Sequence, residues 1–170
     1  FKDVLVLDSE NYDALDALEK LYEAQGRIRD LIEVAEAKAA LPIEVSERVS
    51  LYRRVAAAAA TRNDPEKAEA SWSALLDLDN TDQEAMQQLE AIYSEREDYE
   101  RLAEVLERRA AITEDTDALV RLKVELGTLR AVRMEDYQGA VETFEEALEL
   151  DEACADALAA LDDLYERLED

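Results

Sequence analysis

The chain has 170 residues, of which 48% are apolar, and it carries 44 Asp and Glu against 19 Lys and Arg, a net charge of −25 without any His. Nucleic acids and anionic membranes are bound through basic surfaces, so this charge argues against both as partners. Gly and Pro are sparse, aromatic residues make up 6%, and Ala, Leu and Glu are abundant, which favours helices and predicts no sheet.

Apolar spacing and helix start signals predict ten helices in chain order. Gly26 marks a turn between two helices, Asp64 with Pro65 marks a helix start, and Thr81-x-x-Glu84 has the form of a capping box. The first helix is partial, because Phe1 opens the chain in mid-helix. The predicted helices cover residues 1–7, 10–24, 28–40, 44–62, 65–78, 82–96, 98–112, 117–133, 136–149 and 154–168.

The sequence repeats itself with a long period. The pattern A-L-x-x-L-E-x-x-Y at 14–22 returns with small changes at 85–93 and at 157–165, offsets of 71 and 72 residues. Within the same period, an aromatic residue followed six residues later by Leu-Asp occurs at Phe1, Trp72 and Phe144. A unit of this length holds two helix hairpins of roughly 34 residues plus some extra loop.

One two-helix stretch is more specific. Leu126-Gly127, Asp136-Tyr137, Ala140-x3-Phe144 and the segment 147–151 resemble the tetratricopeptide repeat (TPR) pattern W-x2-L-G-x2-Y, then A-x3-F. Most repeats of this chain carry an acid where the family has Gly, and the closing Pro of the family is absent. The resemblance implies an all-α fold, a right-handed superhelical solenoid of antiparallel helix hairpins, here a fragment of a longer protein.

The same resemblance implies one repeat array over residues 1–170. The partial helix 1–7 comes first, and an unpaired last helix, 154–168, follows the final hairpin. Small residues at Ala68 and Ala140 would let paired helices approach closely, and Trp72 and Phe144, one turn later, would fill the core. The expected hairpins cover about 10–41, 44–78, 82–112 and 117–150.

No motif for catalysis or cofactor binding is found. The acids follow helix spacing, as in Asp16 with Lys20 and Asp163 with Arg167, four residues apart. The acidic stretch 77–84 lacks the Gly and the closing Glu of a calcium loop, and Cys154 has no His partner. We therefore expect no enzyme activity, no cofactor and no metal site.

In the TPR family the first helix of each hairpin lines a concave groove that binds peptides or partner helices. The resemblance implies a protein-binding scaffold, and the acidic surface favours a basic and apolar partner segment. A structural or self-assembling spacer, or a regulatory array of a larger enzyme, are the alternatives. Carried over to this chain, the groove residues are Lys20, Arg53, Ala57, Gln87, Ala91, Ser94 and Thr128.

Two further expectations concern the cellular location of the chain and its self-association. No apolar run reaches the roughly 18 residues of a membrane span, and the excess of Arg over Lys without redox cysteines is compatible with a bacterial, cytoplasmic protein. The apolar stripe of the last helix, from Leu158 to Leu168, lacks a covering helix in the predicted array, so end-to-end self-association of the fragment is a possible outcome.

Overall fold

The structure, a computed structural model, describes residues 2–169 and is all-α over that range. No strand occurs among these residues, and none of their helices is long and apolar enough to span a bilayer. The all-helical prediction is therefore confirmed. The helices are α1 (Lys2–Leu7), α2 (Tyr12–Ala24), α3 (Ile28–Ala39), α4 (Val45–Thr61), α5 (Pro65–Leu78), α6 (Gln83–Glu95), α7 (Tyr99–Ile112), α8 (Thr116–Val132), α9 (Tyr137–Leu150) and α10 (Ala155–Glu169).

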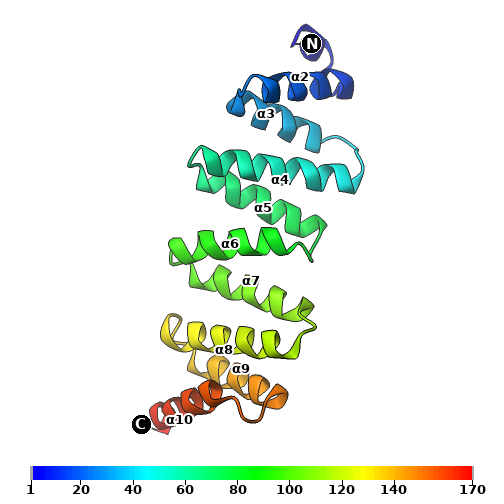
Figure 1. Ribbon diagram of the computed structural model, residues 1–170. Coiled ribbons are helices and arrows are strands. Elements are labelled where there is room, and N and C mark those ends of the chain that lie inside the picture. The colour runs from blue at the N-terminus through cyan, green and yellow to red at the C-terminus, as the bar shows by residue number, and fades with distance from the viewer. Residues whose placement is uncertain (1, 170) are drawn as a thin grey trace. The chain divides into compact units, whose positions relative to one another are not determined.

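The chain divides into two compact units, Phe1–Gln88 and Leu89–Asp170, and the border between them falls within α6. In the first unit α2 packs on α3, α3 on α4, and α4 on α5, while in the second α8 packs on α7 and α9. Figure 1 shows that successive helices in each unit run in opposite directions and are joined by short turns. Each unit is thus a stack of antiparallel helix hairpins. A single continuous array over 1–170 stays a prediction.

Short polar side chains start most of the helices. Each accepts a hydrogen bond from the backbone N–H three residues later, which satisfies one of the free donors of the first turn. Pro65 stands at the first helical position behind its cap, as predicted. The capping box predicted at Thr81 is wrong, because Asp82 is the cap and its Oδ1 accepts the N–H of Ala85 at 2.8 Å. The other caps of this kind are Asn11, Asp64, Asp98, Asp115 and Asp136.

The turn after each first helix contains one residue with a left-handed backbone. Gly26 has φ of 63°, and the corresponding turns use Asn63, Glu97 and Glu135 with φ of 55°, 56° and 55°. Side chains with a Cβ are strained there, and Asn tolerates this conformation better than Glu. In the Gly26, Asn63 and Glu97 turns the next N–H bonds back five residues to a helix carbonyl, which closes the helix as a Schellman motif does.

The cores form between consecutive helices, both within a hairpin and between hairpins. In the first unit, Leu15, Leu18 and Tyr22 of α2 pack with Val34 of α3 and with Leu41. In the second unit Ala140, Phe144 and Ala147 of α9 pack with Leu161 and Leu164 of α10. Cys154 is partly buried against the second cluster. Amphipathic faces thus bury apolar area between consecutive helices, which is the main stabilising contribution.

Close helix approach explains the small residues of the sequence pattern. Ala68 and Ala140 are both fully buried, and so are Trp72 and Phe144 one turn later. A Cβ built on Gly127 of α8 would lie 2.8 Å from Cε1 of the Phe144 ring, closer than two carbon atoms pack without movement. The helices α8 and α9 therefore depend on the absence of a side chain at Gly127.

We expect Ala68→Leu and Ala140→Leu each to lower the free energy of unfolding by about 1–3 kcal/mol, since overpacking forces the paired helices apart. Urea denaturation followed by circular dichroism measures this. The exposed Ala37 of α3 provides the control, because Ala37→Leu adds the same volume at the surface. Equal stability of all three variants would mean that the close helix contact lies elsewhere.

Candidate protein-binding surface

The predicted groove residues of the first unit lie on α2, α4 and α6. Lys20, Ala57 and Gln87 are exposed, and Arg53 is half-buried. Both basic side chains are occupied by acids of the same unit: Lys20 Nζ lies 2.7 Å from Asp16 Oδ2, and Arg53 pairs with Asp82 and with Glu84 at the start of α6. This surface therefore offers little uncompensated positive charge to a ligand.

The predicted residues of the second unit are Ala91, Ser94 and Thr128, and all three are exposed. Thr128 borders a cavity of about 110 Å³ between α8 and α10, whereas Ala91 and Ser94 lie on α6 and do not line it. The Thr128 hydroxyl donates to the carbonyl of Val124 one turn earlier at 2.8 Å. Its hydrogen-bonding capacity is thus partly used within α8.

The cavity between α8 and α10 is mostly apolar. Phe144 of α9 contributes to it from the core, and Asp163 and Arg167, 3.7 Å apart, are its charged residues. Its volume suits one apolar side chain rather than an extended ligand. The sequence did not predict this cavity, because residues from three helices build it. The complete lining is Thr128, Ala131, Val132, Phe144, Ala160, Asp163, Leu164 and Arg167.

The helix α10, which forms one wall of this cavity, is acidic overall. Between residues 155 and 168 the sequence has four acids, Asp156, Asp162, Asp163 and Glu166, and one base, Arg167. Acids concentrated beside an apolar cavity attract ligands that carry an apolar group flanked by cations.

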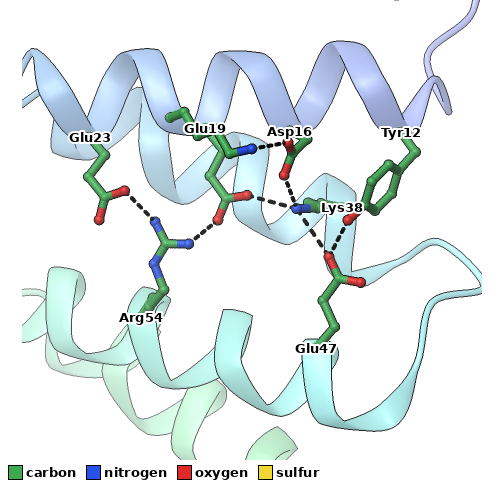
Figure 2. Close-up of polar contacts among 8 residues, drawn as sticks. Tyr12, Asp16, Glu19, Glu23, Lys38, Glu47 and Arg54 are labelled. Carbon is green, nitrogen blue, oxygen red and sulfur yellow. Dashed lines mark hydrogen bonds and ion pairs between the residues drawn. The ribbon is translucent and has the colours of Figure 1, made fainter.

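A buried charge cluster in the first unit connects α2, α3 and α4, and sequence analysis did not find it. Its centre is Lys38, whose side chain is only 5% exposed. Figure 2 shows the Lys38 ammonium between three carboxylates: Nζ lies 2.7 Å from Asp16 Oδ1, 3.0 Å from Glu19 Oε2 and 3.1 Å from Glu47 Oε1. Because an ammonium has three N–H donors, this arrangement can satisfy all of them.

Two further side chains complete the cluster. The Tyr12 hydroxyl donates to Glu47 Oε1 at 2.5 Å, and the Tyr12 ring lies 4.7 Å from Lys38 Nζ in a cation–π contact. Arg54 of α4 pairs with the buried Glu19 and, at 3.2 Å, with Glu23 (Figure 2). Glu19 therefore has a basic partner from α3 and another from α4, so the charges link three consecutive helices.

The cluster changes the acidity of its members. Hydrogen bonds from Lys20 and Lys38 hold the pKa of Asp16 below its ordinary value, and those from Tyr12 and Lys38 do the same for Glu47. Burial alone would lower the pKa of Lys38, but its hydrogen bonds to the three carboxylates outweigh burial and raise it. The ionised form of each group is thus the favoured one in the folded chain.

These shifts predict how stability depends on pH. A carboxyl whose pKa is lowered by folding stabilises the fold above its unfolded pKa, 3.8 for Asp16 and 4.5 for Glu47, and the contribution is lost as the pH falls through the folded pKa. From pH 8 towards 5 the repulsion among the many acids eases, so stability should rise modestly. We expect the free energy of unfolding to be greatest at about pH 5 and to fall below about pH 4.

Urea denaturation from pH 8 to pH 3 measures this curve. The variants Asp16→Asn and Glu47→Gln should flatten its acidic limb, because neither side chain can then titrate. Stability that keeps increasing down to pH 3 would show that general charge repulsion outweighs the cluster.

Comparison with known proteins identifies one hairpin directly. Residues 85–118 match the sequence profile of tetratricopeptide repeats. The chain carries a tetratricopeptide repeat. The matched segment covers most of α6, all of α7 and the start of α8, and the turn and cap described above lie within it. Among curated protein sequences, none is significantly similar to this chain.

Solved structures of TPR proteins have similar folds. A tetratricopeptide repeat protein from Parabacteroides merdae has a TM-score of 0.50 at 15% identity, over 93% of this chain and 61% of its own. MamA gives 0.48 at 22% identity, over 89% and 79%. YrrB, described as a TPR protein with an unusual peptide-binding site, gives 0.48 at 20% identity, over 93% and 78%. The likeness to the Parabacteroides merdae protein, together with the matched repeat, confirms the TPR fold predicted from the sequence.

The TPR register shows that two kinds of hairpin alternate. At the position where the family has Gly, the hairpins α2–α3 and α6–α7 carry Glu19 and Glu90, each paired with a base of the second helix. Arg109 Nη1 lies 2.8 Å and 2.6 Å from the two oxygens of Glu90. The hairpins α4–α5 and α8–α9 instead carry the buried Ala56 and Gly127 there. We call these acid-type and small-type hairpins.

The acidic side chains are not gathered into a metal-binding group in the described part of the chain. Residues 2–168 contain no group of three or more Cys, Asp and Glu side chains placed to hold a metal ion. In the acidic stretch 77–84, Asp79 accepts hydrogen bonds from the Thr81 hydroxyl at 2.7 Å and from its N–H at 3.0 Å, which lower the Asp79 pKa. Asp79 and Asp82 thus shape the turn and cap α6.

Proposed function

We infer that this chain is a protein-interaction scaffold. In the second unit, an apolar side chain of a partner segment would be held between α8 and α10, which both have the first-helix position of the repeat. The observation that carries this is the cavity over Phe144, with Thr128 at its edge and an acidic α10 beside it. The partner segment would combine one apolar anchor with flanking Lys or Arg residues.

The physical argument has two parts. An apolar side chain that leaves water for a largely apolar cavity contributes about 1.5–3 kcal/mol, which is a substantial part of a weak peptide affinity. The acids of α10 add long-range attraction for cations, which increases the association rate and selects against acidic segments. Apolar anchoring and acidic surroundings therefore define the same class of ligand.

Synthetic peptides test the proposal. One set carries a central Leu, Phe or Met flanked by Lys, and a matched set carries Glu in place of Lys. We expect fluorescence anisotropy to show binding of the Lys set, weaker binding in 0.5 M salt because the charges are screened, and no binding of the Glu set. Equal affinity for both sets, or none for either, would contradict the proposal.

Two neighbouring residues of α10 provide a matched pair of variants. Ala160→Phe fills the cavity, whereas Ala159→Phe adds the same ring at an exposed position outside it. Binding should be lost in the first variant and kept in the second, with circular dichroism confirming that both fold. If the two variants bind alike, the ligand lies elsewhere.

A self-assembling spacer is the second candidate. The exposed apolar residues of α1 favour it, since Val6 and Leu7 are 84% and 90% exposed. Sedimentation velocity over a range of concentrations distinguishes the two: a spacer associates with itself, and Val6→Glu with Leu7→Glu should abolish the association without affecting peptide binding.

A further inference from the structure

Asp163 of α10 is the acid at the edge of the cavity in the second unit. It lines the cavity together with Arg167, and its side chain is 74% exposed. Among the residues that the structure describes, Arg167 is its only ionic partner, and Arg167 Nη2 lies 3.7 Å from Asp163 Oδ2, beyond hydrogen-bond distance. The carboxylate therefore keeps its capacity to accept hydrogen bonds from a ligand.

The exposure of Asp163 and Arg167 belongs to their positions in the repeat. The same two positions are exposed in every earlier first helix, although more of the chain follows each of them. This side of the first helices therefore stays open in both units. The exposed residues are Lys20, Ala57, Ala91 and Thr128 at the position of Asp163, and Ala24, Thr61, Glu95 and Val132 at the position of Arg167.

The first unit shows how a base is held at the matching place. Arg54 of α4 has the repeat position that Ala160 has in α10, two residues before the position where the family has Gly. From there Arg54 reaches back to α2, where it pairs with Glu19 and, at 3.2 Å, with Glu23 (Figure 2). A cation is thus bound between two consecutive first helices.

In the second unit this base is missing, and the acid lies on the other wall. Gly127 and Ala131 of α8 stand where α2 has its two acids. Ala160 is too short to cross to α8, and a cavity of about 110 Å³ is present there. Asp163 supplies the acid from α10 instead. The cavity therefore combines an apolar lining with a carboxylate that a ligand's base can reach.

Arg167 is a weak competitor for this carboxylate. Its side chain is 59% exposed, so water screens the attraction between the two charges. Exposed pairs four residues apart on a helix change an equilibrium by only about twofold. A base that is tethered to an anchor in the cavity is held close to Asp163 at a high effective concentration, and it can displace Arg167.

We propose that Asp163 selects the partner segment by pairing with a Lys or Arg next to its apolar anchor, and that Arg167 occupies Asp163 until the segment binds. This proposal rests on the proposed function, because the anchor has to lie in the cavity. It assigns the preference for basic segments to one contact, in addition to the general attraction by the acids of α10.

Paired peptides and paired variants of the full 170-residue chain test the contact by fluorescence anisotropy. One peptide has a central Leu with Lys on both sides, and the other has Gln in place of each Lys. Asp163→Asn should weaken binding of the Lys peptide about two- to fivefold, the effect of one exposed ion pair, and leave the Gln peptide unchanged. Glu166→Gln removes the same charge from an exposed residue of α10 outside the cavity, and its effect should be clearly smaller.

Replacement of Arg167 should act in the opposite direction. Arg167→Gln should strengthen binding of the Lys peptide by about twofold, because Asp163 loses its competitor. Arg108→Gln is the control, since it removes the same positive charge from an exposed residue of α7 outside the cavity. In 0.5 M salt the differences between variants should shrink. Circular dichroism shows whether each variant remains folded.

The outcomes separate this proposal from the proposed function. If Ala160→Phe abolishes binding of the Lys peptide while Asp163→Asn and Glu166→Gln weaken it equally, the cavity is the binding site but the contact with Asp163 is refuted. Equal effects of Arg167→Gln and Arg108→Gln would refute the competition by Arg167. If neither peptide binds the unaltered chain, the proposed function fails, and this proposal fails with it.

Discussion

Replacement of Lys38 by Met should lower the free energy of unfolding by about 3–5 kcal/mol, the cost of leaving a buried carboxylate without its partner. The cost is large because the Glu19 side chain is only 3% exposed. Without Lys38, Glu19 keeps its ion pair with Arg54 of α4. Asp16 and Glu47 are better exposed and can be hydrated. Urea denaturation at pH 7 gives the value.

A double variant tests the cause. Glu19→Gln removes the charge that Lys38 neutralises, so Glu19→Gln with Lys38→Met should be clearly more stable than Lys38→Met alone. The matched change in the second unit, Arg109→Met, should cost less, because Glu90 is 18% exposed and retains access to water. Additive effects of the two changes at 19 and 38 would show that the pair is not coupled.

Phe144→Ala should destabilise the second unit by about 3–5 kcal/mol, because a ring that is almost wholly buried leaves a cavity behind. Phe144 packs with Ala140 and Ala147 of its own helix and with Leu161 and Leu164 of α10. It also lines the cavity between α8 and α10, so its loss should reduce peptide binding as well. Thermal and urea denaturation measure stability, and the anisotropy assay measures binding.

Whether Gly127→Ala stabilises or destabilises the chain depends on the Phe144 ring. Gly127→Ala should destabilise the normal chain, since its Cβ would meet Phe144 Cε1 at 2.8 Å. In the Phe144→Ala background the same change should stabilise, because the clash is gone and Ala favours a helix over Gly by about 1 kcal/mol. The same sign in both backgrounds would mean that the ring does not limit the approach of α8 and α9.

Much of the fold follows from local patterns in the sequence. Apolar spacing located the helices within a few residues of their observed bounds, and Pro65 behind Asp64 marked a start correctly. The capping box failed at Thr81 because Asp82, one residue later, competes for the same N–H groups of the first turn. The left-handed residues Asn63, Glu97 and Glu135 could not be found, since Glu has no preference for that conformation.

The cavity and the Lys38 charge cluster were harder to predict than the helices, because each combines residues of several helices. Thr128 was assigned to a binding groove from the TPR resemblance. The cavity that it lines also needs Phe144 and Leu164 from two other helices, and the sequence did not predict it. Lys38 was overlooked because a single Lys in an Ala-rich helix resembles an exposed residue. One signal was available: Lys38 and Arg109 stand 71 residues apart, on the same faces as Ala35 and Leu106. A base that recurs among buried positions indicates a buried acid opposite it.

The alternation of acid-type and small-type hairpins restricts how such a chain can change its length by recombination. A crossover displaced by a single hairpin would set an acid such as Glu19 opposite a second helix that has an apolar residue, Leu75 or Ala147, at the position of the base. A crossover displaced by 71 or 72 residues keeps each acid opposite its base and each small residue opposite its ring. Viable duplications and deletions should therefore come in pairs of hairpins, which matches the period still visible in the sequence.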